Sequence, residues 1–534
     1  MKSNYLIQEH QKITHQVKLD YNNVRDLLFK KAEENPNKKF LICPGEKHEE
    51  FTYSEFKTIV NQTSQFLIKS GLKKNDKISL IFHNSSEFLI LYFAGLSCGL
   101  TIVPINPEMT YREIKYIIED SDSKAVFYSD TLESKINEIK NFLSSVNFKK
   151  TKSIQDLISL YNTRKKIEYN QISLHDIAVI IYTSGTSGNP KGVILSHLNL
   201  LSDAKGISEW FEFTKDSRCL CILPLFHNNG QITTLLAPLY AGASTIIIKG
   251  KISLYAFWFL VNEYQATWTS VMASILSILL SLPNERKDNS LTAILCGGQI
   301  LTRSVQEQFE KRFKVPIFEG YGLTETTSFS CINNYPAESR KIGSIGKPLQ
   351  INEMSILDED NQEVEENIEG EICIRGYNVA SGYLGDTKTN HAFRNGWFHS
   401  GDYGRRDGDG NFYFHGRKDS LIIKGGENVY PAELENVLYN HPDIDECAVI
   451  GIPDELLGEN ICAFVKIKGK AQLTENDLKK FCKNKIASYK QPKKIIIINN
   501  LVDLNEIPKG PTKKILYRKL KEYYQNSTSK MPKN

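Results

Sequence analysis

Short apolar stretches alternate with helical periods along most of this chain, and this alternation restricts its fold more than any other feature. The apolar stretches are predicted strands at 77–82, 101–104, 125–128, 178–182, 219–223 and 293–296. Helices are predicted between them at 88–99, 111–121, 196–210 and 274–282. Because parallel strands are joined by helical crossovers, the pattern predicts an α/β fold of parallel sheets with helices on both faces.

The character of the sequence changes near residue 352, where short strands and polar turns replace the alternation. These strands are predicted at 354–357, 371–374 and 411–414, with a hairpin signal in Asp407–Gly410. A compact α+β pattern follows, with helices at 431–439, 474–485 and 514–524 around strands at 448–452, 463–467 and 494–498. The 534 residues are predicted to form a large N-terminal domain (1–418) of α/β subdomains and a small β-region, a small α+β C-terminal domain (419–525) and a disordered tail (526–534).

Charge and cysteine content exclude several classes of protein. A net charge of +4, from 66 basic and 62 acidic side chains, is far below the excess of a dedicated nucleic-acid binder. The ten cysteines are scattered, and the closest pair, Cys219 and Cys221, has no histidine near it. This spacing is not that of a zinc site or a disulfide framework, and it indicates a reducing compartment.

The uncharged stretch 88–105 approaches the length of a membrane span. It contains Gly95, Gly99 and Pro104, which favour a buried helix followed by a short buried strand. Residues 1–20 lack the apolar region of a signal peptide. The sequence therefore predicts a soluble, cytoplasmic protein without a membrane span or a nucleic-acid partner.

The strongest local motif is the segment Tyr182–Gly192, YTSGTSGNPKG, between a predicted strand and a predicted helix. Its glycines let backbone N–H groups turn towards an anion, its hydroxyls add donors, and Lys191 adds a positive charge. It is not a Walker A loop, because Gly192 stands where a magnesium-binding Ser or Thr would be, and it lacks the GxGxxG pattern. The motif predicts a phosphate-binding loop of another kind.

This loop resembles the phosphate loop of the adenylate-forming superfamily, which includes acyl-CoA synthetases, peptide-synthetase adenylation domains and firefly luciferase. Further motifs resemble the same superfamily in the same order: PLFHNNG (224–230), GYGLTE (320–325), GEICIRG (370–376), WFHSGD (397–402), GRKD (416–419), GGENVYP (425–431) and PKGPTKKI (508–515). The resemblance extends over essentially the whole chain.

The resemblance implies a mobile C-terminal domain and a reaction in two halves. A carboxylate attacks the α-phosphorus of ATP to give an acyl-adenylate and pyrophosphate, and a thiol then attacks the acyl carbon and releases AMP. The first half brings two anions together and requires positive charge and hydrogen-bond donors around the phosphates. ATP, Mg²⁺ and coenzyme A are the implied cofactor and co-substrates, and a small carboxylic acid is the implied partner.

The resemblance also assigns the nucleotide site. The residues expected to bind ATP are Thr183, Ser184, Gly185, Thr186, Ser187, Gly188, Lys191, Glu319, Gly320, Tyr321, Asp402 and Arg417. In this set the loop holds the β- and γ-phosphates, residues 319–321 form the adenine pocket, and Asp402 and Arg417 hold the ribose. Thr324 would contact the α-phosphate, and Glu325 would bind Mg²⁺ through oxygen. Taken alone, the Thr-Glu pair fits a helix cap and Asp402 fits a turn.

Three features of the C-terminal region complete the implied machinery. Lys514 resembles the mobile catalytic lysine that binds the carboxylate and the α-phosphate. The superfamily usually has glycine where this chain has Lys513, and the continuation 515–518 identifies Lys514 as the equivalent lysine. Asp419 falls at the hinge, and Gly425 and Gly426 would line the thiol tunnel, although ordinary turns explain these residues equally well.

The expected acyl pocket contains two amides. Its residues are His227, Asn228, Asn229, Gly297 and Gly298, and the expected catalytic residues are Lys514, His227, Thr324 and Glu325. A pocket for fatty acids is apolar, and buried amides in it need hydrogen-bond partners. The sequence therefore predicts a polar or aromatic acid, whereas His227 by itself is as well explained as a core residue.

Three functions remain open at this point. The first is an acid–CoA ligase, favoured because no carrier domain is fused to the chain. The second is a stand-alone adenylation enzyme that loads the phosphopantetheine of a carrier protein. The third, from a different class, is a nucleotide-binding regulator. It would have lost catalysis because Lys513 stands where the superfamily usually has glycine.

Overall fold

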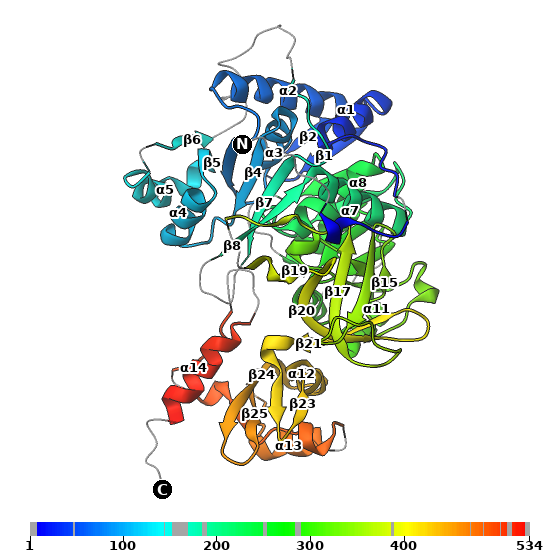
Figure 1. Cartoon of the computed structure of the whole chain (residues 1–534), viewed down its shortest axis with the longest axis vertical. Coiled ribbons are helices and arrows are strands. Elements are labelled where there is room, and N and C mark those ends of the chain that lie inside the picture. Colours follow the sequence, from blue (N-terminus) through cyan, green and yellow to red (C-terminus); the bar gives the residue numbers. More distant parts are fainter. Residues whose placement is uncertain are drawn as a thin grey trace.

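A computed structural model describes most of the chain (Figure 1). The described residues are 8–15, 17–45, 48–143, 145–151, 169–183, 190–248, 254–282, 290–385, 389–469, 471–483, 485–501, 503–509 and 515–528. Among them, two large sheets form the body of the molecule, and two smaller sheets follow in the second half of the sequence.

The first large sheet has nine described strands. In spatial order they are β15 (Lys347–Pro348), β14 (Cys331–Ile332), β13 (Ile317–Tyr321), β12 (Ala293–Cys296), β11 (Trp268–Val271), β9 (Arg218–Cys221), β10 (Ser244–Ile247), β1 (Lys39–Cys43) and β2 (Glu49–Thr52). The strands from β13 to β1 are parallel to their neighbours, and antiparallel strands close both edges.

The second large sheet has seven described strands. They are β18 (Gly382–Tyr383), β8 (Lys191–Ser196), β7 (Ile177–Thr183), β4 (Thr101–Ile105), β3 (Lys77–Ile81), β5 (Ser123–Ser129) and β6 (Asn147–Thr151). The strands from β7 to β6 are parallel, as the alternation predicts, and β8 and β18 are antiparallel additions.

Helices lie between the two sheets and on their outer faces. The layer between them contains α1 (Val24–Glu34), α2 (Tyr53–Lys69), α3 (Ser86–Cys98), α7 (His197–Trp210), the π-helical segment η3 (Asn229–Leu236) and α8 (Ala237–Tyr240). The outer faces are covered by α9 (Phe257–Glu263), α10 (Ala273–Ser281) and α11 (Arg303–Phe313) on one sheet, and by α4 (Tyr111–Asp120) and α5 (Glu133–Lys140) on the other. The predicted α/β architecture of the large domain is confirmed.

The stretch 88–105 folds as predicted, into the buried helix α3 and the buried strand β4. Gly99 ends the helix with φ of 77°, a left-handed conformation that glycine adopts without strain. Among the described residues, no helix combines the length and the hydropathy that crossing a membrane requires. All ten cysteines are described, all are buried, and none forms a disulfide.

The two smaller sheets follow the large ones. The first contains β16 (Asn352–Leu357), β17 (Gly370–Gly376), β20 (Trp397–Arg406), β19 (Phe393–Arg394) and β21 (Phe412–Arg417). The second contains β23 (Glu427–Val429), β22 (Ile422–Lys424), β25 (Gly458–Ile467), β24 (Ile444–Asp454) and β26 (Lys494–Ile497), with α12 (Pro431–Tyr439), α13 (Glu475–Cys482) and α14 (Tyr517–Thr528). Figure 1 shows these last elements, in orange and red, gathered at one end of the molecule.

Two local expectations are corrected. The motif Tyr182–Gly192 does not lead directly into a helix: strand β8 begins at Lys191 and pairs antiparallel with β7, and α7 follows it. Residues 526–528, predicted to belong to a disordered tail, are part of α14, which continues to Thr528.

Candidate active site

The carboxylate of Asp402 is held from two directions. Asp402 on β20 lies opposite Arg417 on β21 in the antiparallel register, and Arg417 Nη1 is 3.1 Å from Asp402 Oδ1. The hydroxyl of Tyr321, at the end of β13, donates to Asp402 Oδ2 at 2.6 Å. The structure thus brings together the predicted ribose pair and the predicted adenine residue, which come from different sheets.

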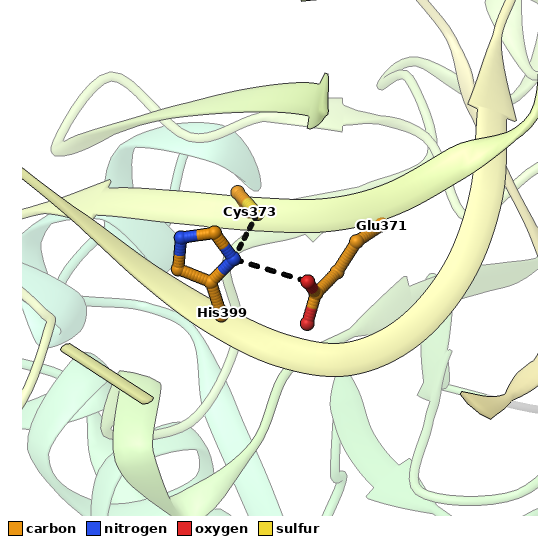
Figure 2. Close-up of side chains that lie close together, drawn as sticks. All are labelled: Glu371, Cys373 and His399. Atoms are coloured by element: carbon orange, nitrogen blue, oxygen red, sulfur yellow. Dashed lines mark hydrogen bonds and ion pairs between the residues drawn. The ribbon is translucent and has the colours of Figure 1, made fainter. Parts of the chain in front are cut away.

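Next to Asp402 along β20, His399 contacts the half-buried carboxylate of Glu371, which lies on β17 (Figure 2). Glu371 on β17 accepts from the Gly401 amide at 2.9 Å and lies 3.0 Å from His399 Nδ1. Burial alone raises the pKa of Glu371, but the hydrogen bonds from His399 and Gly401 outweigh it and hold that pKa below its ordinary value. Glu371 therefore fixes His399 and Gly401, which lie on either side of Ser400. These residues form the backbone that immediately precedes Asp402.

Cys373 completes this cluster without making it a catalytic triad. Its sulfur lies 3.3 Å from His399 Nδ1, the same ring nitrogen that Glu371 contacts. In a triad the nucleophile and the acid contact opposite nitrogens of the histidine. Burial also raises the pKa of the Cys373 thiol, whereas a metal ligand or a nucleophile must be a thiolate.

We expect Glu371→Gln to raise KM for ATP by about tenfold while kcat changes little, because one amide oxygen cannot serve both donors. Initial rates of pyrophosphate release measure both constants. Glu353→Gln is the matched control, since Glu353 pairs with Arg375 in the same sheet and makes no described hydrogen bond to residues 399–402. An unchanged KM in Glu371→Gln would contradict this positioning role.

A second carboxylate lies where the two large sheets meet. Glu325, in the short helix η5 (Thr324–Thr326), accepts a hydrogen bond from the Tyr383 hydroxyl at 2.9 Å. Tyr383 lies on β18, which pairs with β8, and Lys191 Nζ at the start of β8 is 5.6 Å from the Tyr383 ring centre. The lysine of the phosphate motif therefore lies beside the tyrosine that binds the predicted magnesium ligand.

The backbone that follows Glu325 is strained. Thr327 has φ of 65° and ψ of −63°, and the Ser328 amide donates to the Thr326 carbonyl at 2.8 Å across it. This is the rare form of the γ-turn, and such a conformation costs about 1–3 kcal/mol for a β-branched residue. Asn378 holds the turn by accepting from the Thr327 hydroxyl at 2.6 Å and donating to the Thr326 carbonyl at 3.2 Å.

Asn228 binds the backbone on either side of Thr324 and Glu325, a role that the sequence did not suggest. Its amide Nδ2 donates to the carbonyl of Thr327 at 2.7 Å and to that of Leu323 at 3.4 Å. These acceptors flank Thr324 and Glu325, so Asn228 ties the predicted acyl segment to the predicted phosphate segment. The amide that was expected to face the acid is occupied by the strained turn.

We expect Asn228→Leu to lower the free energy of unfolding by about 1–3 kcal/mol, because buried carbonyls lose their donor. Acyl-adenylate formation should fall with every acid tested, since Thr324 and Glu325 lose a fixed position. Urea unfolding and pyrophosphate release measure the two effects. Asn229→Leu is the matched control and should alter only the preference among acids. A change confined to acid preference in Asn228→Leu would contradict the turn-holding role.

The other expected acyl residues lie at the ends of neighbouring elements. His227 is half-buried next to Phe226, with ring centres 4.8 Å apart, and Asn229 begins η3 with its buried side-chain oxygen unpartnered among the described residues. Gly297 and Gly298 follow β12, with Gly297 buried and Gly298 facing open space. Burial raises the pKa of Glu319, on the adjacent strand β13, to about 8.

Several expected residues are not brought to this site by the described structure. Residues 184–188 of the phosphate loop and Lys514 lie outside the described residues. Asp419 lies in the short helix η8 (Lys418–Ser420) between β21 and β22. Gly425 and Gly426 connect β22 to β23 with φ of 60° and 87°, a two-residue hairpin turn that requires positive φ at both positions.

The structure adds residues to which the sequence assigned no role. They are Glu371, His399, Asn378, Tyr383 and Asp203. Glu371 lies in the motif GEICIRG and His399 in the motif WFHSGD. Their position inside these motifs is the sequence feature that could have identified them. Asn378, Tyr383 and Asp203 carry no such signal, because each acts through a partner more than 50 residues away.

Comparisons with known proteins identify the family of this chain. The family model "AMP-binding enzyme" matches residues 28–384, and "AMP-binding enzyme C-terminal domain" matches 433–506. Oxalate–CoA ligase of Arabidopsis thaliana is 33% identical, covering 95% of this chain and 99% of that protein. Sulfoacetate–CoA ligase of Cupriavidus necator is 30% identical, covering 94% and 97%.

The fold is similar to that of solved ligases as well. The crystal structure of the anthranilate CoA ligase AuaEII with anthranoyl-AMP has a TM-score of 0.88 at 25% identity, covering 96% of this chain and 99% of that one. The fold predicted from the sequence and the resemblance stated on its motifs are both confirmed. The chain belongs to the family of AMP-binding enzymes and is an AMP-forming enzyme similar to acyl-CoA synthetases.

Proposed function

We propose that this enzyme activates a small carboxylic acid with ATP and transfers its acyl group to coenzyme A. The observation that carries the proposal is the continuity of one segment, 319–329, through the site. Tyr321 in this segment binds Asp402, and Glu325, four residues later, binds Tyr383 beside Lys191. The ribose of ATP and its phosphates can thus be held at the two ends of one short segment of the chain.

In the first half-reaction, an oxygen of the acid attacks the α-phosphorus of ATP. The bond from that phosphorus to the bridging oxygen breaks, and pyrophosphate leaves. Asp402 accepts from the ribose hydroxyls while Tyr321 and Arg417 hold it in place. The Thr324 hydroxyl donates to the α-phosphate, and Lys191 and Lys514 supply positive charge where negative charge gathers.

Glu325 fits the requirements of a magnesium ligand. Its carboxylate offers the hard oxygen atoms that Mg²⁺ prefers, and Tyr383 orients one of them. When bound, Mg²⁺ neutralises charge on the phosphates.

In the second half-reaction, the sulfur of coenzyme A attacks the acyl carbon of the acyl-adenylate. The bond from that carbon to the phosphate oxygen breaks, AMP leaves, and the proton of the thiol passes to solvent. We infer that residues from 419 onward form a domain that rotates about Asp419 between the two halves. The separate sheet β22–β26 and its own core support this domain boundary.

The experiment is a measurement of acid-dependent pyrophosphate release over a panel of fatty, aryl and short polar acids. Coenzyme A and a phosphopantetheine-bearing carrier protein are compared as acceptors, and AMP and the thioester are quantified by chromatography. Release of AMP and formation of the CoA thioester are expected. Pyrophosphate without CoA thioester would favour the carrier-protein function, and ATP binding without pyrophosphate exchange would favour the regulator.

A further inference from the structure

A segment near the start of the chain lies against two strands of the site. It begins with the 3₁₀ helix η1 (Glu9–Gln11), which packs against β17 and β20. The side chains of His10 and Gln11 are buried there. Further along, His15 Nε2 lies 2.7 Å from the carbonyl oxygen of Gln350. The segment is therefore fixed to the protein at both of its ends.

Two buried side chains of this segment bind one short stretch of backbone. His10 Nε2 lies 2.9 Å from the carbonyl oxygen of Ala380, and Gln11 Nε2 donates to that of Val379 at 2.8 Å. Because a carbonyl oxygen can only accept, the His10 ring donates from Nε2. These bonds hold the backbone shortly before β18, the strand that contains Tyr383.

The same stretch of backbone is bonded to the predicted magnesium ligand. The Ala380 amide donates to the main-chain carbonyl of Glu325 at 2.8 Å. His10 and Glu325 therefore bind the same peptide residue, one at its carbonyl and the other at its amide. A displacement of Ala380 would move the backbone that carries the Glu325 carboxylate.

Packed rings lead from His10 to the side chain of the same glutamate. The ring centres of His10 and Phe393 lie 4.8 Å apart, and Phe393 meets the Tyr383 ring edge to face at 5.7 Å. Tyr383 in turn donates from its hydroxyl to Glu325 Oε1 at 2.9 Å. His10 is thus connected both to the main chain of Glu325 and to its carboxylate.

We propose that His10 is a positioning residue for magnesium binding and holds Glu325 in place through its hydrogen bond to Ala380. This role rests on the proposed function, in which Glu325 is a magnesium ligand. Mg²⁺ requires nearly ideal octahedral geometry, so a ligand oxygen that is free to shift binds it less well. Residues behind a metal ligand set its orientation, and metal affinity falls when they are altered.

The test compares the affinity of the enzyme for ATP with Mg²⁺ and with EDTA, measured by isothermal titration calorimetry without any acid present. The ratio of the two dissociation constants gives the contribution of Mg²⁺ to binding. His10→Phe keeps a ring beside Phe393 but removes the donor to Ala380, and it should lower this ratio by about threefold to tenfold. His10→Gln supplies an amide donor instead and should recover most of the ratio.

His15→Phe is the matched control for His10→Phe. His15 lies in the same segment, and its Nε2 also binds a backbone carbonyl, that of Gln350, so its replacement should leave the ratio unchanged. Thermal unfolding of each variant separates positioning from folding, because a purely structural role of His10 would lower Tm without changing the ratio.

An unchanged ratio in His10→Phe would overturn the positioning role alone. An equal loss in His15→Phe, or no recovery in His10→Gln, would do the same. If Mg²⁺ did not alter the ATP affinity of the unmodified enzyme and no acid gave pyrophosphate, the proposed function would fail, and the role of His10 with it.

Discussion

Lys514→Ala should lower the rate of acyl-adenylate formation by about 10²–10³-fold and leave CoA transfer from a supplied acyl-adenylate largely intact. The lysine charge is needed when the carboxylate and the α-phosphate approach each other, and that repulsion is absent once the mixed anhydride exists. Pyrophosphate release measures the first half, and thioester formation from synthetic acyl-adenylate measures the second.

Two neighbouring lysines serve as controls for Lys514. Lys509→Ala removes a lysine that is paired with Glu446 in the C-terminal sheet, and adenylation should be nearly unaffected. Lys513→Ala tests the position where the superfamily usually has glycine. Equal loss of both half-reactions in Lys514→Ala, or a larger loss in Lys513→Ala, would show that Lys514 is not the adenylation lysine.

Asp419→Pro should uncouple the half-reactions, with adenylation preserved and CoA transfer falling steeply. Asp419 lies in the 3₁₀ turn η8, a conformation that typically has φ near −50° to −70°, and proline holds φ near −65°. The substitution is therefore compatible with the present backbone but prevents the change of dihedral angle that rotation of the following domain requires.

Asp419→Ala is the control for this hinge, because alanine removes the side chain and keeps the backbone free. It should retain both half-reactions. Tyr430, in the C-terminal domain, packs against Gly416, and its ring centre lies 6.2 Å from that of Tyr403. Rotation of the domain has to break these contacts. Unchanged thioester formation in Asp419→Pro would place the hinge elsewhere.

Local sequence patterns predicted most of the elements because their causes are local. The boundaries of α12 (Pro431–Tyr439) and β12 (Ala293–Cys296) agree with the predicted ones, since apolar spacing, a proline at the first helical position and flanking polar residues define them. Strand β8 was missed because its apolar run of three residues is too short to show a period. Its strand character comes from pairing with β7.

The sequence by itself determined the family, the α/β architecture and the residues expected around ATP, because ordered motifs and apolar periods lie within short stretches of chain. Only the tertiary structure decided that Asn228 holds a strained turn, that Glu371 binds the backbone next to Asp402 and that Asp203 accepts from the backbone amide of Phe329. These roles depend on hydrogen bonds between residues about 30 to 130 positions apart. Sheet register and helix packing set such contacts, and no local pattern records them.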